Sequence, residues 1–447
     1  MATKRTAVGS KGANAPRTGK GANTANAARA GKGANTANAA RVGAVTRIEI
    51  EGFKSIATAT LDLGLLNVFV GANGSGKSSL FEAIAVLAAA AAGRIDSIEL
   101  DRRGARLSPI GRYSTHLTTT KAPKVISLGA LGREGTEYRV GVRPPDGSNG
   151  TAWHYRRETI ADAAGTDLDR RVRGGYFLDE QDVSLHLPTL DALRGFASSM
   201  PPNARKSVTI NRLLARLTSF MIFDPLTPML RGTASEPMAN EALGLRGGRL
   251  AEALEEVLAS PGQRGASLLE DYRALMEWSD DVDVSAPTKQ LLAAGVPALR
   301  KIVRFRDRYM PEGDNHVSAY DASEGALYLL FALVLTSHAH APKFAAVEHL
   351  DHALHPRLAR ALFRLLADRV KQSGQQLLLS THLPTSLDGL ALADDDVRLF
   401  VVDRAVEGQT VVHRVQYGDA LAKAEASGLT LSQLWVQGAL GGVPDVW

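Results

Sequence analysis

Eight residues from Gly71 to Ser78 combine glycines, a lysine and a serine in an order suited to holding phosphate groups. They read Gly-Ala-Asn-Gly-Ser-Gly-Lys-Ser and match the pattern G-x(4)-G-K-[ST]. The glycines let backbone N–H groups turn toward phosphates, Lys77 supplies a positive charge, and Ser78 supplies a hydroxyl ligand for Mg²⁺. Leu65 to Val70 predicts a strand before the loop, and Ser78 to Ala91 predicts a helix after it, as this motif requires. We therefore predict that this segment binds ATP with Mg²⁺, and the candidate ligands are Asn73, Gly74, Ser75, Gly76, Lys77, Ser78 and Ser79.

A second candidate metal ligand follows a short apolar run later in the chain. Phe344 to Val347 predicts a strand, and Glu348 comes directly after it. A phosphate-binding loop of this kind works with a carboxylate on a neighbouring strand, which helps to hold Mg²⁺. We therefore predict that Ser78 and Glu348 form the Mg²⁺ site.

Three histidines, His349, His352 and His355, follow Glu348 at intervals of three residues. Zinc is commonly bound by histidines at helical spacing. This spacing drifts around a helix, however, and the chain contains no cysteine that could complete a thiolate site. A structural or phosphate-side role is therefore favoured over a zinc site.

The elements that must position these residues alternate between strands and helices, which predicts an α/β fold with a parallel central sheet. Strand-like runs between residues 124 and 160 alternate with turns and predict an antiparallel β lobe. Helical patterns broken by prolines predict an inserted helical lobe. We expect four segments: a tail (1–44), an N-terminal lobe with the loop and the antiparallel β lobe (45–185), the inserted helical lobe (186–300) and a C-terminal lobe (301–447).

The first 44 residues differ in composition from the rest of the chain. The sequence GKGANTANAAR occurs there twice, without large apolar residues, which predicts a disordered tail. Residues 1–47 hold nine Lys or Arg and no Asp or Glu, so the net charge of +5 comes from the tail and the remainder is mildly acidic. We expect a passive tail, with non-specific contact to nucleic acid as the alternative.

The composition also indicates in which cellular compartment the chain is expected. No apolar run reaches the roughly 20 residues that cross a bilayer, so we expect no membrane span. Because the chain has no cysteine, it forms no disulfides, which fits a reducing compartment. We expect a cytoplasmic protein.

Taken together, the motifs resemble those of the ABC-type ATPases of the RecF, SMC and OLD-like group, including the compact heads of bacterial anti-phage systems. The segments that carry the resemblance are Ile50 to Ile56, Asn67 to Ser79, Ser323 to Ala326, Leu354 to Pro356 and Leu379 to His382. The resemblance covers residues 45–447 and implies a P-loop NTPase head of the ABC type with a mixed or parallel central sheet. It also implies a homodimer or higher oligomer in which two heads sandwich ATP. Ser323 and Gly325 of one head would then cap the γ-phosphate on the other, and His382 would sense that phosphate.

Two departures from the family pattern concern hydrolysis and coupling. The family carries a catalytic glutamate after the metal-side acid, and this chain has His349 there. His349 or Asp351 could still activate water, but slow hydrolysis is the simpler expectation. The family's Q-loop glutamine cannot be placed, because the first glutamine of the chain is Gln181. The catalytic candidates are Glu348, His349 and His382.

The resemblance implies an ATPase that senses DNA or a phage product and controls a separate, nuclease-like effector in anti-phage defence. The alternatives are a RecF-like ATPase of DNA repair and an ATP-gated scaffold that barely hydrolyses. We expect no TOPRIM nuclease domain, because 65 residues follow His382. The segment Ser323 to Ala326 resembles the signature of ABC-type ATPases. Its long distance in sequence from the phosphate-binding loop argues against the head of a membrane transporter. A basic stretch near residue 300 could face nucleic acid, although a solvated strand face explains it more simply. Its residues are Arg300, Lys301, Arg304, Arg306 and Arg308.

Overall fold

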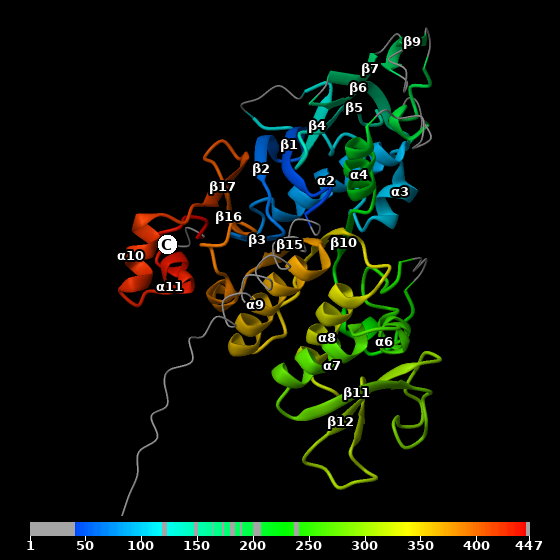
Figure 1. Cartoon of the computed structure of the whole chain (residues 1–447), viewed down its shortest axis with the longest axis vertical. Coiled ribbons are helices and arrows are strands. Elements are labelled where there is room, and N and C mark those ends of the chain that lie inside the picture. Colours follow the sequence, from blue (N-terminus) through cyan, green and yellow to red (C-terminus); the bar gives the residue numbers. More distant parts are fainter. Residues whose placement is uncertain are drawn as a thin grey trace, which may run out of the picture.

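The computed structural model of the chain describes residues 41–118, 123–146, 151–163, 165–171, 174–178, 184–187, 190–199, 207–236 and 241–443. The predicted tail lies outside the described residues up to residue 40, and so does Gln181. Figure 1 shows an upper β-rich lobe, a sheet in the middle, and a lower lobe of helices with a small sheet.

A six-stranded sheet forms the middle of the structure, in the order β10-β14-β15-β3-β16-β17 (Figure 1). Its strands are β10 (Met221–Phe223), β14 (Phe344–Val347), β15 (Gln376–Thr381), β3 (Leu66–Val70), β16 (Val397–Arg404) and β17 (Thr410–Val415). Neighbouring strands from β10 to β16 are parallel, and β17 is antiparallel at the edge. The predicted mixed central sheet is confirmed. Parallel strands are covered on both faces, which explains their nearly continuous apolar sequences.

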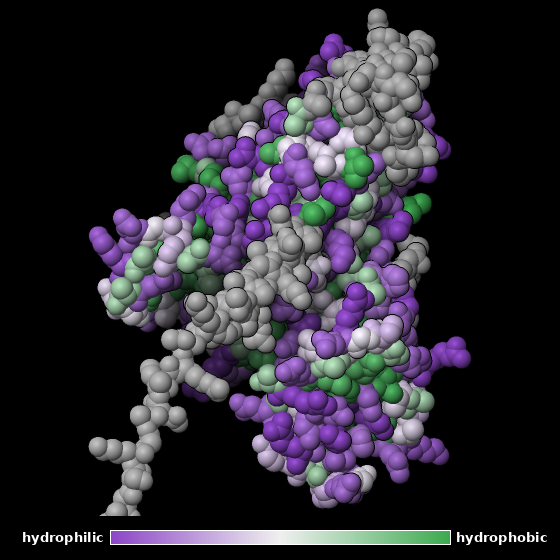
Figure 2. Space-filling model, viewed as in Figure 1, coloured by the Kyte–Doolittle hydropathy of each residue, from purple (hydrophilic) through white to green (hydrophobic). Residues whose placement is uncertain are grey.

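The two faces of this sheet belong to two separate cores. Val68 and Val70 of β3 pack with helices α8 (Glu324–Ser337) and α9 (Pro356–Ser373). Phe69 points the other way and packs with helix α2 (Lys77–Ala92) and the upper lobe. On the face seen in Figure 2, hydrophilic side chains predominate and hydrophobic ones form separate groups, as expected when the cores are internal.

The upper lobe is an eight-stranded antiparallel sheet in the order β2-β1-β4-β5-β6-β7-β8-β9. Its strands are β2 (Ile56–Asp62), β1 (Val45–Phe53), β4 (Ile126–Gly132), β5 (Glu137–Arg143), β6 (His154–Asp162), β7 (Gly165–Arg171), β8 (Gly174–Leu178) and β9 (Ser184–Leu187). Helices α3 (Ser97–Arg102) and α4 (Val208–Thr218) lie beside α2 in this lobe (Figure 1). The predicted antiparallel β lobe is confirmed, and it also includes β1 and β2, the first two of the three strands before the phosphate-binding loop.

The lower lobe consists of helices that pack on α8 and α9, together with a small sheet. The helices are α5 (Thr227–Leu230), α6 (Leu250–Ala259) and α7 (Arg264–Leu275), and the sheet contains β11 (Ser279–Ser285), β12 (Ile302–Asp307) and β13 (His316–Ser318). Short elements elsewhere are η1 (Ala197–Ser199), η3 (Pro384–Gly389), α10 (Asp419–Ala426) and α11 (Leu431–Val436). None of the helices in the described part of the chain has the length and apolar character of a membrane span.

Two strands lie in the segment for which helices were predicted. β10 has three residues, too few to show a periodic pattern, and it exists through its parallel pairing with β14. β11 is rich in aspartate, which is uncommon in strands, but these side chains form ion pairs with Arg304 and Arg306 of β12. Both strands therefore depend on partners that are distant in the sequence.

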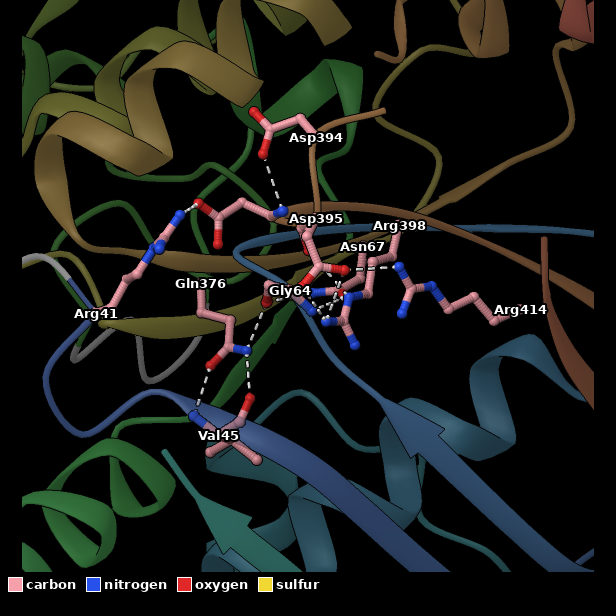
Figure 3. A network of polar contacts seen from close by, with 10 residues as sticks. Arg41, Val45, Gly64, Asn67, Gln376, Asp394, Asp395, Arg398 and Arg414 are labelled. Carbon is pink, nitrogen blue, oxygen red and sulfur yellow. Dashed lines mark hydrogen bonds and ion pairs between the residues drawn. The ribbon is translucent and has the colours of Figure 1, made fainter. Parts of the chain in front are cut away.

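Buried amide side chains join the upper lobe to the amino ends of the parallel strands (Figure 3). Gln376 Nε2 donates to the carbonyl oxygens of Val45 and Gly64, at 2.7 Å each, and Gln376 Oε1 accepts from the N–H of Val45 at 3.1 Å. Asn67 Oδ1 accepts from the N–H of Gly64 at 2.8 Å, and Asn67 Nδ2 donates to the carbonyl of Leu377 at 3.2 Å. Both side chains are fully buried. They supply hydrogen bonds to buried backbone groups of Val45, Gly64 and Leu377, and the carbonyl of Gly64 accepts from both amides.

Ion pairs surround the same junction (Figure 3). Arg41, the first described residue, pairs with Asp396. Asp395 pairs with Arg398 at 3.2 Å and with Arg414 at 2.9 Å. The described chain therefore begins at the edge of the central sheet where its parallel strands start.

We expect Gln376→Ala to lower the free energy of unfolding by about 2–4 kcal/mol, because it removes the side-chain partner of the buried N–H and carbonyl of Val45 and one of the two donors to the carbonyl of Gly64. Chemical denaturation followed by circular dichroism measures this change. Gln372→Ala is the matched control, since Gln372 is an exposed residue of α9, and its effect should stay within about 0.5 kcal/mol. Equal effects of the two substitutions would contradict the prediction.

Candidate functional site

The phosphate-binding loop connects the end of β3 to the start of α2. Gly74 and Gly76 have φ of 77° and 114°, in the region that favours glycine. A Cβ at Gly71 would lie 2.0 Å from the carbonyl oxygen of Val402, and one at Gly76 would lie 2.2 Å from Oγ1 of Thr410. Side chains are therefore excluded from these positions, and the loop presents its backbone, as the motif predicts.

Thr410, at the start of the edge strand β17, supports the loop. Its hydroxyl donates to the carbonyl of Ser75 at 2.9 Å and lies 2.7 Å from the hydroxyl of Ser55. The hydroxyl of Ser75 itself is buried and, in the described part of the chain, has no hydrogen-bond partner. A buried, unpaired hydroxyl in a backbone loop of this shape fits a site that a bound phosphate completes.

Lys77 and Ser78 make the contacts that give the loop its chemistry. Lys77 Nζ donates to the carbonyl oxygens of Gly71 at 2.8 Å and Ala72 at 2.9 Å, so the ammonium group lies over the loop. The hydroxyl of Ser78 donates to Oε1 of Glu348, which brings the two predicted Mg²⁺ ligands together. Burial lowers the pKa of Lys77 to about 8 and raises the pKa of Glu348. Phosphates beside Lys77 and a divalent cation beside Glu348 would favour the charged forms again.

A cavity of about 620 Å³ opens beside the loop. The predicted residues in its lining are Asn73, Gly74, Gly76, Lys77, Ser78, Ser79, Glu348, His349 and His382. The lining also contains four basic side chains, which are Lys54, Arg106, Arg112 and Arg404. That these four lie together at one cavity was not predicted from the sequence. Among the described residues that line the cavity, Glu348 is the only acidic one. The field inside the cavity therefore favours a polyanion such as a triphosphate.

Glu82 of α2 holds two of these basic side chains in place. Its buried carboxylate accepts from Lys54 Nζ at 2.5 Å and from Arg106 Nε at 2.7 Å. Lys54 lies in the turn between β1 and β2, within a segment that carried the family resemblance. Arg106 lies in an irregular segment after α3, where no local pattern marks it.

His349 is the second residue after β14 and interacts with a residue that sequence reasoning missed. Its Nδ1 is 3.1 Å from Oδ1 of Asp224, which directly follows β10. This hydrogen bond raises the pKa of His349. His349 has a φ of 55°, and the left-handed conformation costs a non-glycine residue about 1–2 kcal/mol. Backbone strain of this kind clusters at functional sites.

His382 directly follows β15 and lines the same cavity. The rings of His349 and His382 are nearly parallel, with 13° between their planes and 6.1 Å between their centroids. Burial and the positive charge of Lys77 lower the pKa of His382 to about 4. The two histidines therefore differ in the direction of their pKa shifts, although they end neighbouring strands.

The other polar residues that follow Glu348 have partners of their own. Asp351 is buried and accepts hydrogen bonds from the hydroxyls of Thr381, at 2.5 Å, and Ser386, so it does not line the cavity. His352 donates from Nδ1 to a backbone carbonyl at 2.8 Å, and His355 caps the start of α9. Within the described residues, no group of three His, Asp or Glu side chains is arranged to hold a metal ion.

The signature segment, Ser323 to Ala326, starts α8. Ser323 caps the helix by accepting from the N–H of Ala326 at 3.3 Å. A Cβ at Gly325 would lie 3.1 Å from the carbonyl oxygen of Ala353, so glycine allows the helix to approach the segment after Glu348. Ser323 is exposed, and neither Ser323 nor Gly325 lines the cavity of its own chain. The structure therefore does not bring these two residues to the loop.

The basic stretch near residue 300 lies on β12, away from the loop. Arg304 Nε donates to Asp283 at 2.8 Å, and Arg306 Nε donates to Asp280 at 2.7 Å, across the β11–β12 pair. Both carboxylates lie on the neighbouring strand and neutralise these charges. This arrangement fits a solvated strand face better than a nucleic-acid surface.

Solved structures of Smc head domains resemble the chain at low sequence identity. The Smc head bound to the C-winged helix domain of ScpA is 13% identical, with a TM-score of 0.45 over 85% of this chain and 99% of that one. The Pyrococcus furiosus Smc head with an extended coiled coil, bound to the C-terminal domain of ScpA, is 13% identical, with a TM-score of 0.46 over 86% and 99%. The SMC head domain from Thermotoga maritima is 11% identical, with a TM-score of 0.39 over 83% and 99%. Because these TM-scores are below 0.5, the fold assignment rests on the strand order and loop geometry.

More than half of the chain matches the sequence pattern of one protein family. The family is described as "AAA domain, putative AbiEii toxin, Type IV TA system", and the match covers residues 66–163 and 230–388. These ranges contain the phosphate-binding loop, the signature segment, Glu348 and His382. A comparison with curated proteins finds no match. The fold is that of a nucleotide-binding ATPase head, a class that generally uses a nucleotide with a divalent metal ion, and the chain belongs to this AAA-domain family.

Proposed function

We propose that the chain binds ATP with Mg²⁺ and hydrolyses it within an ATP-dependent dimer of heads. The observation that carries the proposal is one basic cavity that holds the loop, the Ser78–Glu348 contact and the two strand-end histidines together. Backbone N–H groups and Lys77 would hold the phosphates, and Ser78 and Glu348 would hold Mg²⁺. The metal ion, when bound, offsets the negative charge of the phosphates.

Lys77→Ala should weaken ATP binding by about 10- to 100-fold, because the loss of a charge-assisted contact costs about 1.5–3 kcal/mol. Titration of a fluorescent ATP analogue in the presence of Mg²⁺ measures this change. Chelation of Mg²⁺ should also weaken binding to the wild type, since Glu348 would then lie beside the phosphates without a cation between them. Lys301→Ala is the control, because Lys301 is a partly exposed residue that pairs with Glu255. Unchanged affinity of Lys77→Ala would place the nucleotide site elsewhere.

The exposed signature segment supports a site that two copies share. Ser323 combines a hydroxyl with the N-terminus of α8, and both favour an anion. This end of the helix is exposed, and its residues are absent from the lining of its own cavity. The γ-phosphate bound to a second copy of the chain is the ligand that we propose for it.

Ser323→Arg should prevent dimerisation on ATP, because a bulky cation would replace the small hydroxyl at the shared site. Light scattering after gel filtration, with Mg²⁺ and a slowly hydrolysed ATP analogue, measures the mass. Ser427→Arg, at an exposed position after α10, is the control and should leave dimerisation intact. An equal mixture of Ser323→Arg and Lys77→Ala should recover part of the dimer, since a mixed pair has one intact site. Dimerisation of Ser323→Arg at the wild-type level would exclude this interface.

We propose further that the dimer senses DNA or a phage product in the cytoplasm and controls a separately encoded, nuclease-like effector in anti-phage defence. The description of the family names a toxin of a toxin–antitoxin system. Such a system has at least two genes, which supports a head that works with a separate partner. RecF-like DNA repair is the second candidate, because a nucleotide-binding head of this fold also suits DNA transactions.

Expression of the gene with its neighbours in a phage-sensitive bacterium should reduce plaque formation. The protection should be lost with Lys77→Ala and kept with Lys301→Ala, because ATP binding is required. Plaque counts across several phages measure it. If plaque counts stayed unchanged while Lys77→Ala lowered survival after DNA damage, the repair function would replace the defence function.

A further inference from the structure

Asp224 lies just outside the cavity, in contact with its lining residue His349, and the proposed function gives it no role. It is half-exposed and follows β10, a strand with no predicted role in the site. Its one hydrogen-bonded side-chain partner among the described contacts is His349, at 3.1 Å from Oδ1 to Nδ1. His349 occupies the position next to the predicted Mg²⁺ ligand Glu348 and lines the cavity. The structure therefore joins a carboxylate to an imidazole beside the phosphate-binding loop.

The strand register brings the two residues together. β10 and β14 are parallel, with Phe223 opposite Val347. The N–H of Glu348 donates to the carbonyl of Phe223 at 2.8 Å, which extends the pairing by one residue. Asp224 and His349 then leave their strands at the same edge of the sheet. The edge strand β10 has only three residues, and Asp224 is the first residue after it.

Backbone contacts hold both partners. The N–H of Asp224 donates to the carbonyl of Leu245 at 2.9 Å, in the segment before α6. The carbonyl of His349 accepts from Nδ1 of His352 at 2.8 Å. The left-handed backbone of His349 directs the chain away from β14 at the point where the ring meets Asp224. The pair is thus fixed from two sides, as an orienting contact requires.

We propose that Asp224 is a positioning residue that holds the imidazole of His349 for ATP hydrolysis, and this inference rests on the proposed function. With Nδ1–H donated to Asp224, the neutral ring keeps the lone pair of Nε2 for the cavity. Nε2 then accepts a hydrogen bond from the water that attacks the γ-phosphate. A carboxylate that fixes the tautomer and orientation of a histidine serves the same purpose in other hydrolytic sites.

The water oxygen bonds to the γ-phosphorus while the bond from that phosphorus to the β–γ bridging oxygen breaks. The electron pair of the broken bond stays on ADP, and the water proton passes to Nε2 of His349. The proton leaves to solvent before the next turnover. His349 with Asp224 thereby performs the task for which the resemblance implies a glutamate, and ATP is turned over in this site.

Four proteins form a cycle that tests the pair: the wild type, Asp224→Asn, His349→Glu and the double variant. Phosphate release at saturating Mg²⁺ and ATP gives kcat, and titration with a fluorescent ATP analogue gives the Kd. Asp224→Asn should lower kcat by about 10- to 100-fold, a part of what an acid–base group contributes. The Kd should change by less than about 3-fold, because Asp224 does not line the cavity beside the phosphates.

The loss of kcat caused by Asp224→Asn should disappear or reverse when His349 is replaced by glutamate. In the His349→Glu background, Asp224 lies beside another carboxylate instead of an imidazole, so Asp224→Asn should leave kcat unchanged or raise it. Asp224→Glu should keep part of the wild-type kcat, because it retains a carboxylate. Asp283→Asn, which removes the charge of a half-exposed carboxylate that pairs with Arg304, should leave kcat and Kd unchanged.

Each result has one meaning. A wild-type kcat retained in Asp224→Asn, or an equal loss of kcat in both backgrounds, would overturn the role of Asp224 while leaving ATP binding intact. ATP binding without turnover in the wild type would overturn it too and would favour a scaffold. Failure of the wild type to bind ATP would instead overturn the proposed function itself.

Discussion

The contact between Ser78 and Glu348 is the interaction on which the rest of the site depends. The two residues are 270 positions apart in the sequence, and they meet because β3 and β14 are parallel, with β15 between them. Parallel strands end at the same edge of a sheet, so the segments that follow them can share one ligand. Along this edge, the site residues follow one another in the order of the strands that carry them, from Asp224 through Glu348 and His382 to the loop. The upper and lower lobes are inserted without disturbing that edge.

The two edges of the central sheet use polar groups in opposite ways. At the amino ends of the strands, the side-chain amides of Gln376 and Asn67 form hydrogen bonds with backbone atoms and join the sheet to the upper lobe. At the carboxyl ends, the hydroxyl of Ser75 is buried without a partner in the described part of the chain, and Lys77 is folded back on loop carbonyls. Rigid pairing at one edge thus holds the strands in register, while the other edge keeps groups available for a ligand.

The sequence could predict those parts of the site that follow strong local patterns. Glu348 and His382 each follow an apolar run, so their places at strand ends could be read without knowledge of the partners. Asp224 follows a strand of three residues whose existence depends on pairing with β14, and Arg106 lies in an irregular segment. Thr410 starts the edge strand β17, and its contact with the loop depends on tertiary packing. Residues placed by long-range pairing are the ones that local periodicity misses.

The two histidines of the site show how strand position changes the chemistry of one residue type. His349 is joined to the carboxylate of Asp224, which favours the protonated ring, whereas burial beside Lys77 favours the neutral ring of His382. A neutral imidazole can donate one N–H to a phosphate oxygen, which suffices to detect a bound nucleotide. An imidazole backed by a carboxylate is suited to accepting a proton as well. A head that served only as a latch would need the first of these arrangements alone, whereas the hydrolysis that we propose uses the second.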